Sequence, residues 1–587
     1  MLFGSCAKQA TQHRTIDYSK AGPVLPEKPQ DQPGTAVVKI EPGPALAIDT
    51  SAYDLNTRLA FLVIKQGYYN QKVRDKVGDF YKQTNFQTRW LHQDAPNDLY
   101  YSFTSMVKSS SRYGMNPEEY ALQQLEERVA ALYKTNPISM TEAYNLDIQL
   151  TGIFFLFTTH VIDGRILEAG FGRDIWIRES ARKDKLDVSL LAKSCAAGSC
   201  EENLQSLHPT HEQYLKLQTA LAQYRELEKK SPAISTIAST EPIKPGMNSA
   251  ALPAIRKRLV YTDLALSQAT HDSTANVVTD STYYDDVLVS AVKWFQYRHG
   301  LEPDGVIGKG TLKFMNQSFR EKADLIALNL ERLRWQRQQT AEKLIIVNLP
   351  EYKMRLYDNN KETMTMRVIV GAQATSTPVF SDTLRYLVFS PTWNVPISII
   401  KGEIIPHLLK DSAYYNNRNY RFYKGGAEID PSLENWSAAN PNQYTVVQLP
   451  GGDNALGRVK FVMPNNMSIY MHDTPNHRLF TKSYRAMSHG CVRLDEPARL
   501  AEYLLHDQYG WTTERVKKAM MGEQPMTIIL KKPYRIQLEY RTTWVDEAGL
   551  VNFREDIYGH DRRQIEWLQT SNKQGVVING AVAMEMP

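Results

Sequence analysis

The chain has few cysteines and no long apolar run, and each shortage excludes a class of protein. Its 587 residues contain four cysteines, Cys6, Cys195, Cys200 and Cys491, too few for a disulfide-rich scaffold. No stretch reaches the roughly 20 apolar residues that a membrane-spanning helix needs. The strongest apolar run, 150–162, contains His160, so we expect a helix in a protein core.

The chain also lacks a strong charge and the common binding motifs. A formal net charge of +5 over this length does not favour nucleic acid as a partner, although it suits anionic polymers at a surface. There is no P-loop, GxGxxG, zinc-finger or HExxH spacing, so we expect no cofactor and no metal. Hydrophobic residues make up 42% and charged residues 23%, as in ordinary globular proteins.

Three of the cysteines have readings that the sequence leaves open. Cys195 and Cys200 flank a short loop with Gly198 and are predicted as a disulfide, with two free thiols or a metal pair as alternatives. Phe3-Gly4-Ser5-Cys6 resembles the end of a lipoprotein signal. Either Cys6 carries a lipid and residues 1–50 form a tether, or the segment is a plain disordered leader.

The densest cluster of reactive side chains lies late in the chain. His472 is followed, after fifteen residues, by Ser488-His489-Gly490-Cys491. A cysteine is a strong nucleophile only as a thiolate, so it needs an imidazole nearby to take the proton. Helical spacing after Asp495 predicts that Cys491 lies at or just before a helix N-terminus, which would lower its pKa. The alternative is a buried structural cysteine.

This segment resembles the L,D-transpeptidase signature His-x(14–17)-[Ser/Thr]-His-Gly-Cys. The resemblance implies that Cys491 is the nucleophile and His472 its base. It also implies that three residues orient the base and form the oxyanion site: Ser488, His489 and Gly490. Where the family often has Asn, this chain has Arg493, a weak departure. The family resemblance further implies acylation by carbapenems.

Four residues near this signature are candidate substrate contacts: Arg493, Tyr470, Asp473 and Trp393. Arginines suit the carboxylates of a peptide stem, and Arg458 ranks below Arg493. Asp473 either orients the imidazole or is a plain turn residue. We expect His477 and His506 to be structural.

The rest of the chain predicts a multidomain α+β protein. We expect a helical scaffold at 51–245, a linking helix at 321–343, a mainly β catalytic domain at 344–535 and a C-terminal hairpin and tail at 536–587. Residues 246–320, with Trp294, Gly300, Asp304-Gly305 and Thr311, resemble a three-helix peptidoglycan-binding domain. They are expected to contact glycan or to act as a spacer.

A long insertion at 397–450, rich in Tyr, Asn, Lys and Arg, is predicted to cap the active site. This domain order resembles the large periplasmic, YcbB-like L,D-transpeptidases along nearly the whole chain. That resemblance implies a periplasmic location facing the cell wall, with membrane tethering only if Cys6 is lipidated.

The resemblance also implies a reaction on peptidoglycan stems. The thiol would be acylated by a donor tetrapeptide with release of D-Ala, and an acceptor amine would then form a 3→3 cross-link. Two other functions use the same features: an L,D-carboxypeptidase, in which water accepts the acyl group, and a non-catalytic wall-binding scaffold. A zinc peptidase is poorly supported, because no ligand set is evident.

Overall fold

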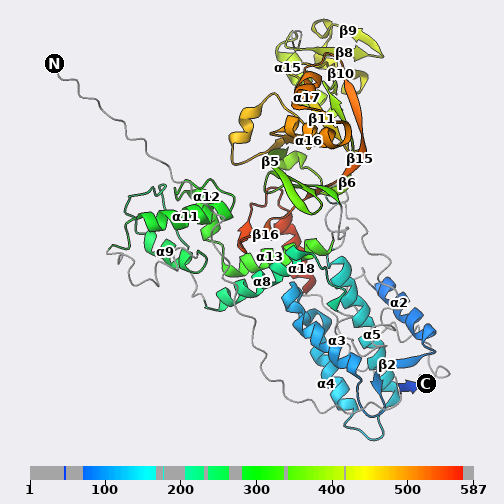
Figure 1. The fold of residues 1–587 in the computed structure, drawn as a ribbon. Helices are drawn as coiled ribbons and strands as arrows, with labels where there is room; N and C mark the ends of the chain where they lie inside the picture. Colours follow the sequence, from blue (N-terminus) through cyan, green and yellow to red (C-terminus); the bar gives the residue numbers. More distant parts are fainter. Residues whose placement is uncertain are drawn as a thin grey trace.

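The computed structural model describes residues 45–47, 70–166, 176, 205–230, 236–263, 280–335, 342–415 and 418–572. The lipid anchor at Cys6 and the Cys195–Cys200 disulfide lie outside these residues and stay predictions. In the described part of the chain, no helix is both long and apolar enough to cross a bilayer. The molecule has a helical end, a catalytic end and a side domain, which meet around α13 (Figure 1).

The helical end is built on α5 (Met140–Asp163), which contains the apolar run and is buried along most of its length. The predicted core helix is therefore confirmed. His160 inside it accepts or donates a 2.8 Å hydrogen bond with the Tyr120 hydroxyl, which satisfies a polar group in an apolar core. Around α5 lie β1 (Ala45–Ala47), α2 (Asn70–Gln83), β2 (Gln87–His92), α3 (Asp98–Lys108), η2 (Ser109–Tyr113), η3 (Pro117–Tyr120) and α4 (Leu122–Leu132).

The side domain consists of α9 (Leu252–Val260), α11 (Asp286–Arg298) and α12 (Lys309–Met315). Their apolar faces share one core, which includes Ile255, Val292 and Phe295. The chain turns after α11 at Gly300, whose φ of 68° suits a residue without a side chain.

Two long helices join the parts of the molecule. α8 (Glu212–Lys230) packs against α13 (Phe319–Arg334), and both contact the hairpin of β16 (Thr543–Val545) and β17 (Val551–Phe553). α13 begins with a capping box between Ser318 and Glu321, which satisfies N–H groups of its first turn. α18 (His560–Asn572), which follows this hairpin in the chain, also packs against α13.

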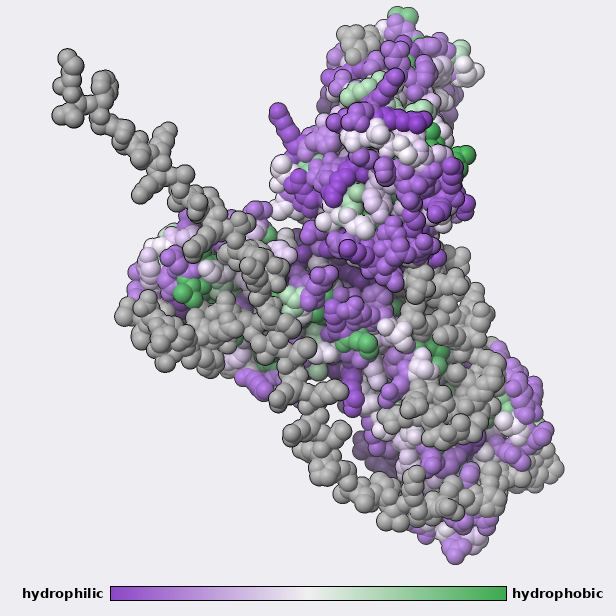
Figure 2. Space-filling model, viewed as in Figure 1, coloured by the Kyte–Doolittle hydropathy of each residue, from purple (hydrophilic) through white to green (hydrophobic). Residues whose placement is uncertain are grey.

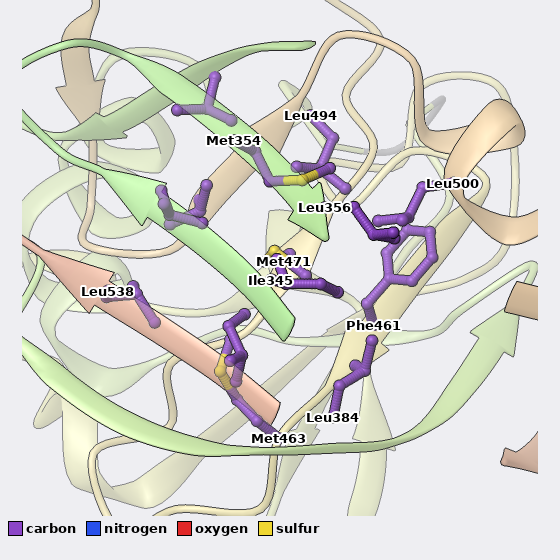
Figure 3. Packing of buried hydrophobic residues seen from close by; sticks show 14 of the residues in the cluster. Ile345, Met354, Leu356, Leu384, Phe461, Met463, Met471, Leu494, Leu500 and Leu538 are labelled. Carbon is purple, nitrogen blue, oxygen red and sulfur yellow. The ribbon is translucent and has the colours of Figure 1, made fainter. Parts of the chain in front are cut away.

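The catalytic end is a nine-stranded sheet in the order β13-β5-β14-β12-β11-β6-β15-β3-β4, and an extra β4–β5 pairing closes it on itself. Its apolar side chains fill one core, shown in part in Figure 3. The strands are β3 (Lys343–Asn348), β4 (Lys353–Asp358), β5 (Lys361–Gly371), β6 (Phe380–Phe389), β11 (Val459–Val462), β12 (Met471–His472), β13 (Ala486–Ser488), β14 (Val492–Leu494) and β15 (Met526–Glu539). Helices α16 (Pro497–Tyr509) and α17 (Thr513–Met520) follow β14.

The inserted segment forms its own small layer beyond this sheet (Figure 1). Its four strands run in the order β7-β10-β8-β9 over a separate apolar core that includes Ile400, Phe422 and Trp436. The elements are β7 (Trp393–Asn394), α14 (Ile397–Ile399), the π-helix η6 (Ile400–Ile404), α15 (Ile405–Lys410), β8 (Tyr420–Lys424), β9 (Ala427–Ile429) and β10 (Tyr444–Gln448). We call residues 393–448 the cap.

The structure corrects the predicted C-terminal boundary at 535. β15 continues to Glu539, and its last residues pair in parallel with β3, from Arg535 opposite Leu344 to Glu539 opposite Asn348. A boundary at 535 would therefore cut through the catalytic sheet. The predicted C-terminal hairpin consists only of β16 and β17, because the residues up to Glu539 belong to the sheet.

Candidate active site

Cys491 lies in the turn between β13 and β14 and is partly exposed. The predicted helix N-terminus at this position is wrong, because β14 intervenes and α16 begins only at Pro497. Burial raises the pKa of the Cys491 thiol; the N–H and hydroxyl of Tyr470 and the charges of Arg493 and Lys460 lower it, but do not compensate. The resting sulfur is thus a neutral thiol, and Sγ lies 3.6 Å from the carbonyl oxygen of Ser468.

The turn that carries the thiol is held by its own residues. The buried Ser488 donates its hydroxyl to the Cys491 carbonyl at 2.6 Å and accepts the Gly490 N–H at 3.2 Å. Gly490 has a φ of 116°, a conformation that a side chain strongly disfavours. Thr377 adds a 2.7 Å hydrogen bond to the Gly490 carbonyl. Ser488 therefore orders the turn that carries Cys491, and both of its hydrogen bonds stay within that turn.

His472 lies on β12, the strand next to β14, and is buried. Its Nδ1 lies 2.5 Å from the Asp473 carbonyl oxygen, which fixes the proton on that nitrogen. Burial and then the charge of Arg493 lower the pKa of His472 to about 3, although the carbonyls of Asp473 and Leu456 raise it. The imidazole is neutral at physiological pH and able to accept a proton.

Tyr470 links the cap to the sulfur. Burial raises its pKa, as do the charge of Cys491 and a hydrogen bond with it, while a hydrogen bond from Trp393 lowers it. Its ring meets that of His472 edge-on, with centroids 5.7 Å apart. Of the candidate substrate contacts, Tyr470 therefore lies at the sulfur, and Trp393, in the first strand of the cap, contacts Tyr470.

His489 points away from the base and toward the cap. Its Nε2 lies 2.7 Å from Oε1 of Glu403, a residue of the π-helix η6, and both side chains are about half exposed. This contact does not support the expectation that His489 orients His472. Glu403 had no distinguishing feature in the sequence, since it lies in an insertion without a motif.

Asp473 contacts the imidazole of His472 through its backbone carbonyl and not through its carboxylate. Its side chain accepts the N–H groups of Arg458 at 2.8 Å and Thr474 at 2.7 Å, and it lies 3.3 Å from His477. The carboxylate thus stabilises the loop, which favours the interpretation of Asp473 as a turn residue. Its backbone carbonyl orients the imidazole. His506 lies 3.1 Å from the Trp511 carbonyl at the end of α16, as expected of a structural residue.

Sequence reasoning missed Lys460. It lies on β11, directly opposite His472, and Nζ is 5.5 Å from the centre of the Tyr470 ring. The alternation of buried Val459 and Phe461 with partly exposed Lys460 was visible in the sequence. What the sequence did not reveal is that this strand pairs with the one carrying His472. No group of three metal-binding side chains occurs in the described ranges.

Comparisons with known proteins agree with the domain order. Residues 342–528 match the L,D-transpeptidase catalytic domain family, YkuD. Residues 75–221 match the scaffold domain family, and residues 265–315 match a candidate peptidoglycan-binding domain family. A Haemophilus influenzae protein described as a candidate L,D-transpeptidase is 35% identical over 228 residues, which are 38% of this chain and 46% of that protein. The chain thus spans about half the length of this relative.

The similar solved structures have low sequence identity and low TM-scores. An L,D-transpeptidase from Mycobacterium smegmatis has 14% identity, a TM-score of 0.18 and coverage of 34% of this chain and 59% of its own. One from Stackebrandtia nassauensis has 13% identity, a TM-score of 0.19 and coverage of 53% and 98%. Such low TM-scores carry no argument about this site.

The closed sheet lies mostly within the residues that match the L,D-transpeptidase catalytic domain family, and the scaffold and candidate peptidoglycan-binding matches precede it in the chain. The chain therefore contains a domain similar to the catalytic domain of L,D-transpeptidases.

Proposed function

We propose that the protein is a peptidoglycan L,D-transpeptidase with Cys491 as nucleophile and His472 as base. The main support is that the matched catalytic domain contains a partly exposed thiol beside a buried, neutral imidazole on the adjacent strand. Such an imidazole is able to take the thiol proton as the sulfur attacks. Because the resting Sγ lies against the Ser468 carbonyl, the thiol turns toward His472 before this transfer.

The donor in this proposal is a tetrapeptide stem. Sγ bonds to the carbonyl carbon of the third residue, and the proton passes to His472. The tetrahedral intermediate collapses as the C–N bond breaks, and the imidazolium protonates the departing D-Ala. The amine of an acceptor stem then attacks the thioester, which forms the 3→3 cross-link and returns a proton to the thiol. In this proposal backbone N–H groups near Cys491 stabilise the oxyanion; the Gly490 N–H is not among them in the resting turn, because Ser488 accepts it.

The setting of the reaction is part of the proposal. Residues 265–315 match a domain family named for peptidoglycan, so contact with the wall glycan follows naturally. A periplasmic location and a lipid tether on Cys6 are further parts of this proposal.

Intact-mass analysis with a disaccharide-tetrapeptide donor tests this function. Wild type should show a thioester adduct and a tripeptide-linked dimer, and Cys491→Ala should show neither. A tripeptide without a dimer would identify an L,D-carboxypeptidase instead. Absence of adduct and product, with retained binding to purified sacculi, would leave only a wall-binding scaffold.

A further inference from the structure

Three residues form a row across three adjacent strands beside the nucleophile. Lys460 of β11 pairs with His472 of β12, and His472 pairs with Arg493 of β14. Directly paired residues on neighbouring strands project from the same face of a sheet. Two cationic side chains therefore flank the proposed base on the face that carries it.

Neither cation has a carboxylate within 4 Å among the described residues. Lys460 contacts the Tyr470 ring at 5.5 Å, and Nε of Arg493 is buried without a hydrogen-bond partner. The nearby acids contact other partners: Glu403 lies against His489, although its charge also acts on Arg493, and Asp473 binds backbone N–H groups and His477. A partly buried ammonium and guanidinium without a carboxylate in direct contact favour an anionic ligand.

Both charges also act on the sulfur. Arg493 and Lys460 lower the pKa of Cys491, and burial lowers the pKa of both cations while Cys491 raises it. An anion held between these two residues would thus lie close to any carbonyl that the thiol attacks. Figure 2 shows the catalytic end as a mainly hydrophilic surface, so a charged ligand meets no broad apolar barrier on the face shown.

We propose that Lys460, together with Arg493, binds the free carboxylate of the residue that the reaction releases, and that Lys460 makes the enzyme specific for donors ending at that residue. The inference rests on the proposed function. Three bonds separate the attacked carbon from the carboxylate carbon of the leaving residue, a span of about 4 Å. That carboxylate is therefore the closest anionic group of the donor to the sulfur. Lys460 is a binding residue and takes no proton in the reaction.

Donors with and without the charge test the specificity. Wild type, Lys460→Met and Lys460→Arg are compared on a tetrapeptide stem and on the same stem with a C-terminal amide. Loss of one charge-assisted contact should lower kcat/KM of Lys460→Met for the acid about tenfold, mainly through KM. The amide donor should lose less than the acid with Lys460→Met, since it loses only the effect of the Lys460 charge on the thiolate. The acid-to-amide ratio of kcat/KM should therefore fall in Lys460→Met, and Lys460→Arg should retain most of it. An equal loss on both donors would overturn the proposal.

A second test does not require transpeptidase activity. The rates at which iodoacetate and iodoacetamide alkylate Cys491 are measured in the full chain, since the reagents differ mainly in a carboxylate. Lys460→Met should lower the iodoacetate-to-iodoacetamide rate ratio several-fold, whereas the exposed control Lys482→Met should leave it unchanged. An unchanged ratio in Lys460→Met refutes carboxylate binding. Equal slowing by both reagents would show that Lys460 acts only on the thiolate. A changed ratio without any thioester adduct would refute the proposed function but retain the anion site.

Discussion

At the scale of single residues, the resting site is a neutral thiol beside a neutral imidazole. Burial raises the pKa of Cys491 and lowers that of His472 to about 3, so the two groups do not form a thiolate–imidazolium pair in the resting protein. Activation then depends on groups that stabilise the anion when it forms. Tyr470 provides two of them, its N–H and its hydroxyl.

Removal of the Tyr470 hydroxyl should therefore make the thiol less reactive. A hydrogen bond to a charged group contributes about 1.5–3 kcal/mol, so Tyr470→Phe should slow alkylation by iodoacetamide at pH 7.5 about tenfold. Because the lost bond favoured the thiolate, the inflection of the rate against pH should move upward. Alkylation followed from pH 6 to pH 10.5 measures both effects. The exposed Tyr484→Phe is the control, and an inflection that stays at the wild-type pH would refute this role.

At the scale of elements, the stability of the β3–β4 hairpin should depend strongly on pH. The buried Glu351 binds Arg355 through two 2.6 Å contacts. Burial alone would raise the pKa of Glu351, but the hydrogen bonds and charge of Arg355, with Lys353 and Arg554, lower it to about 2. A lowered pKa contributes stability that is present above the ordinary carboxyl pKa and is lost as the pH falls toward 2.

Glu351→Gln should therefore destabilise the catalytic domain at pH 7 and much less in acid. The shift from 4.5 to about 2 corresponds to about 3 kcal/mol at neutral pH. Thermal midpoints at pH 7, 4 and 3 measure the difference, which should shrink steadily toward pH 3. Glu362→Gln, which removes the longer and more exposed contact with Arg355, should cost under about 1 kcal/mol. A difference that is constant with pH would contradict the assignment.

The cap is joined to the turn of Cys491 by the contact between His489 and Glu403. An exposed contact of this kind contributes about 0–1 kcal/mol, so Glu403→Gln should barely change global stability. It should, however, increase hydrogen–deuterium exchange in residues 397–410, because their side-chain contact with the turn is weakened. Exchange measured by mass spectrometry, with Glu434→Gln inside the cap as control, tests this. Faster exchange in both variants, or in neither, would show that the contact does not restrain the cap.

The sequence predicted the elements better than their contacts. The apolar run of α5, the helix after Asp495 and the β-rich catalytic domain followed from local patterns. The positions of Lys460 and Glu403 did not, because they depend on pairing between strands and segments far apart in the chain. The placement of Cys491 at the N-terminus of that helix was wrong, because three residues that pair with β5 and β12 lie between them.

At the scale of the whole molecule, α13 is the joint between the scaffold and the catalytic end (Figure 1). Its buried Glu331 accepts the Ile166 N–H at 2.9 Å and the Trp335 indole N–H at 3.1 Å, and it pairs with Arg334 at 2.6 Å. Arg334 in turn donates to the Tyr113 carbonyl of the scaffold. One carboxylate therefore joins α13 to the scaffold through buried, charge-assisted hydrogen bonds.

Loss of this charge should weaken the attachment of the scaffold to α13. Glu331→Gln leaves the buried Arg334 without its counter-ion, which typically costs about 3–5 kcal/mol. Because Glu331 also receives scaffold N–H groups, the scaffold should unfold at a lower temperature, in a calorimetric transition separate from that of the catalytic domain. Glu226→Gln, which removes an exposed pair with Lys229 on α8, should leave both transition temperatures at their wild-type values. If both transitions of Glu331→Gln moved together, or neither moved, α13 would be a passive linker.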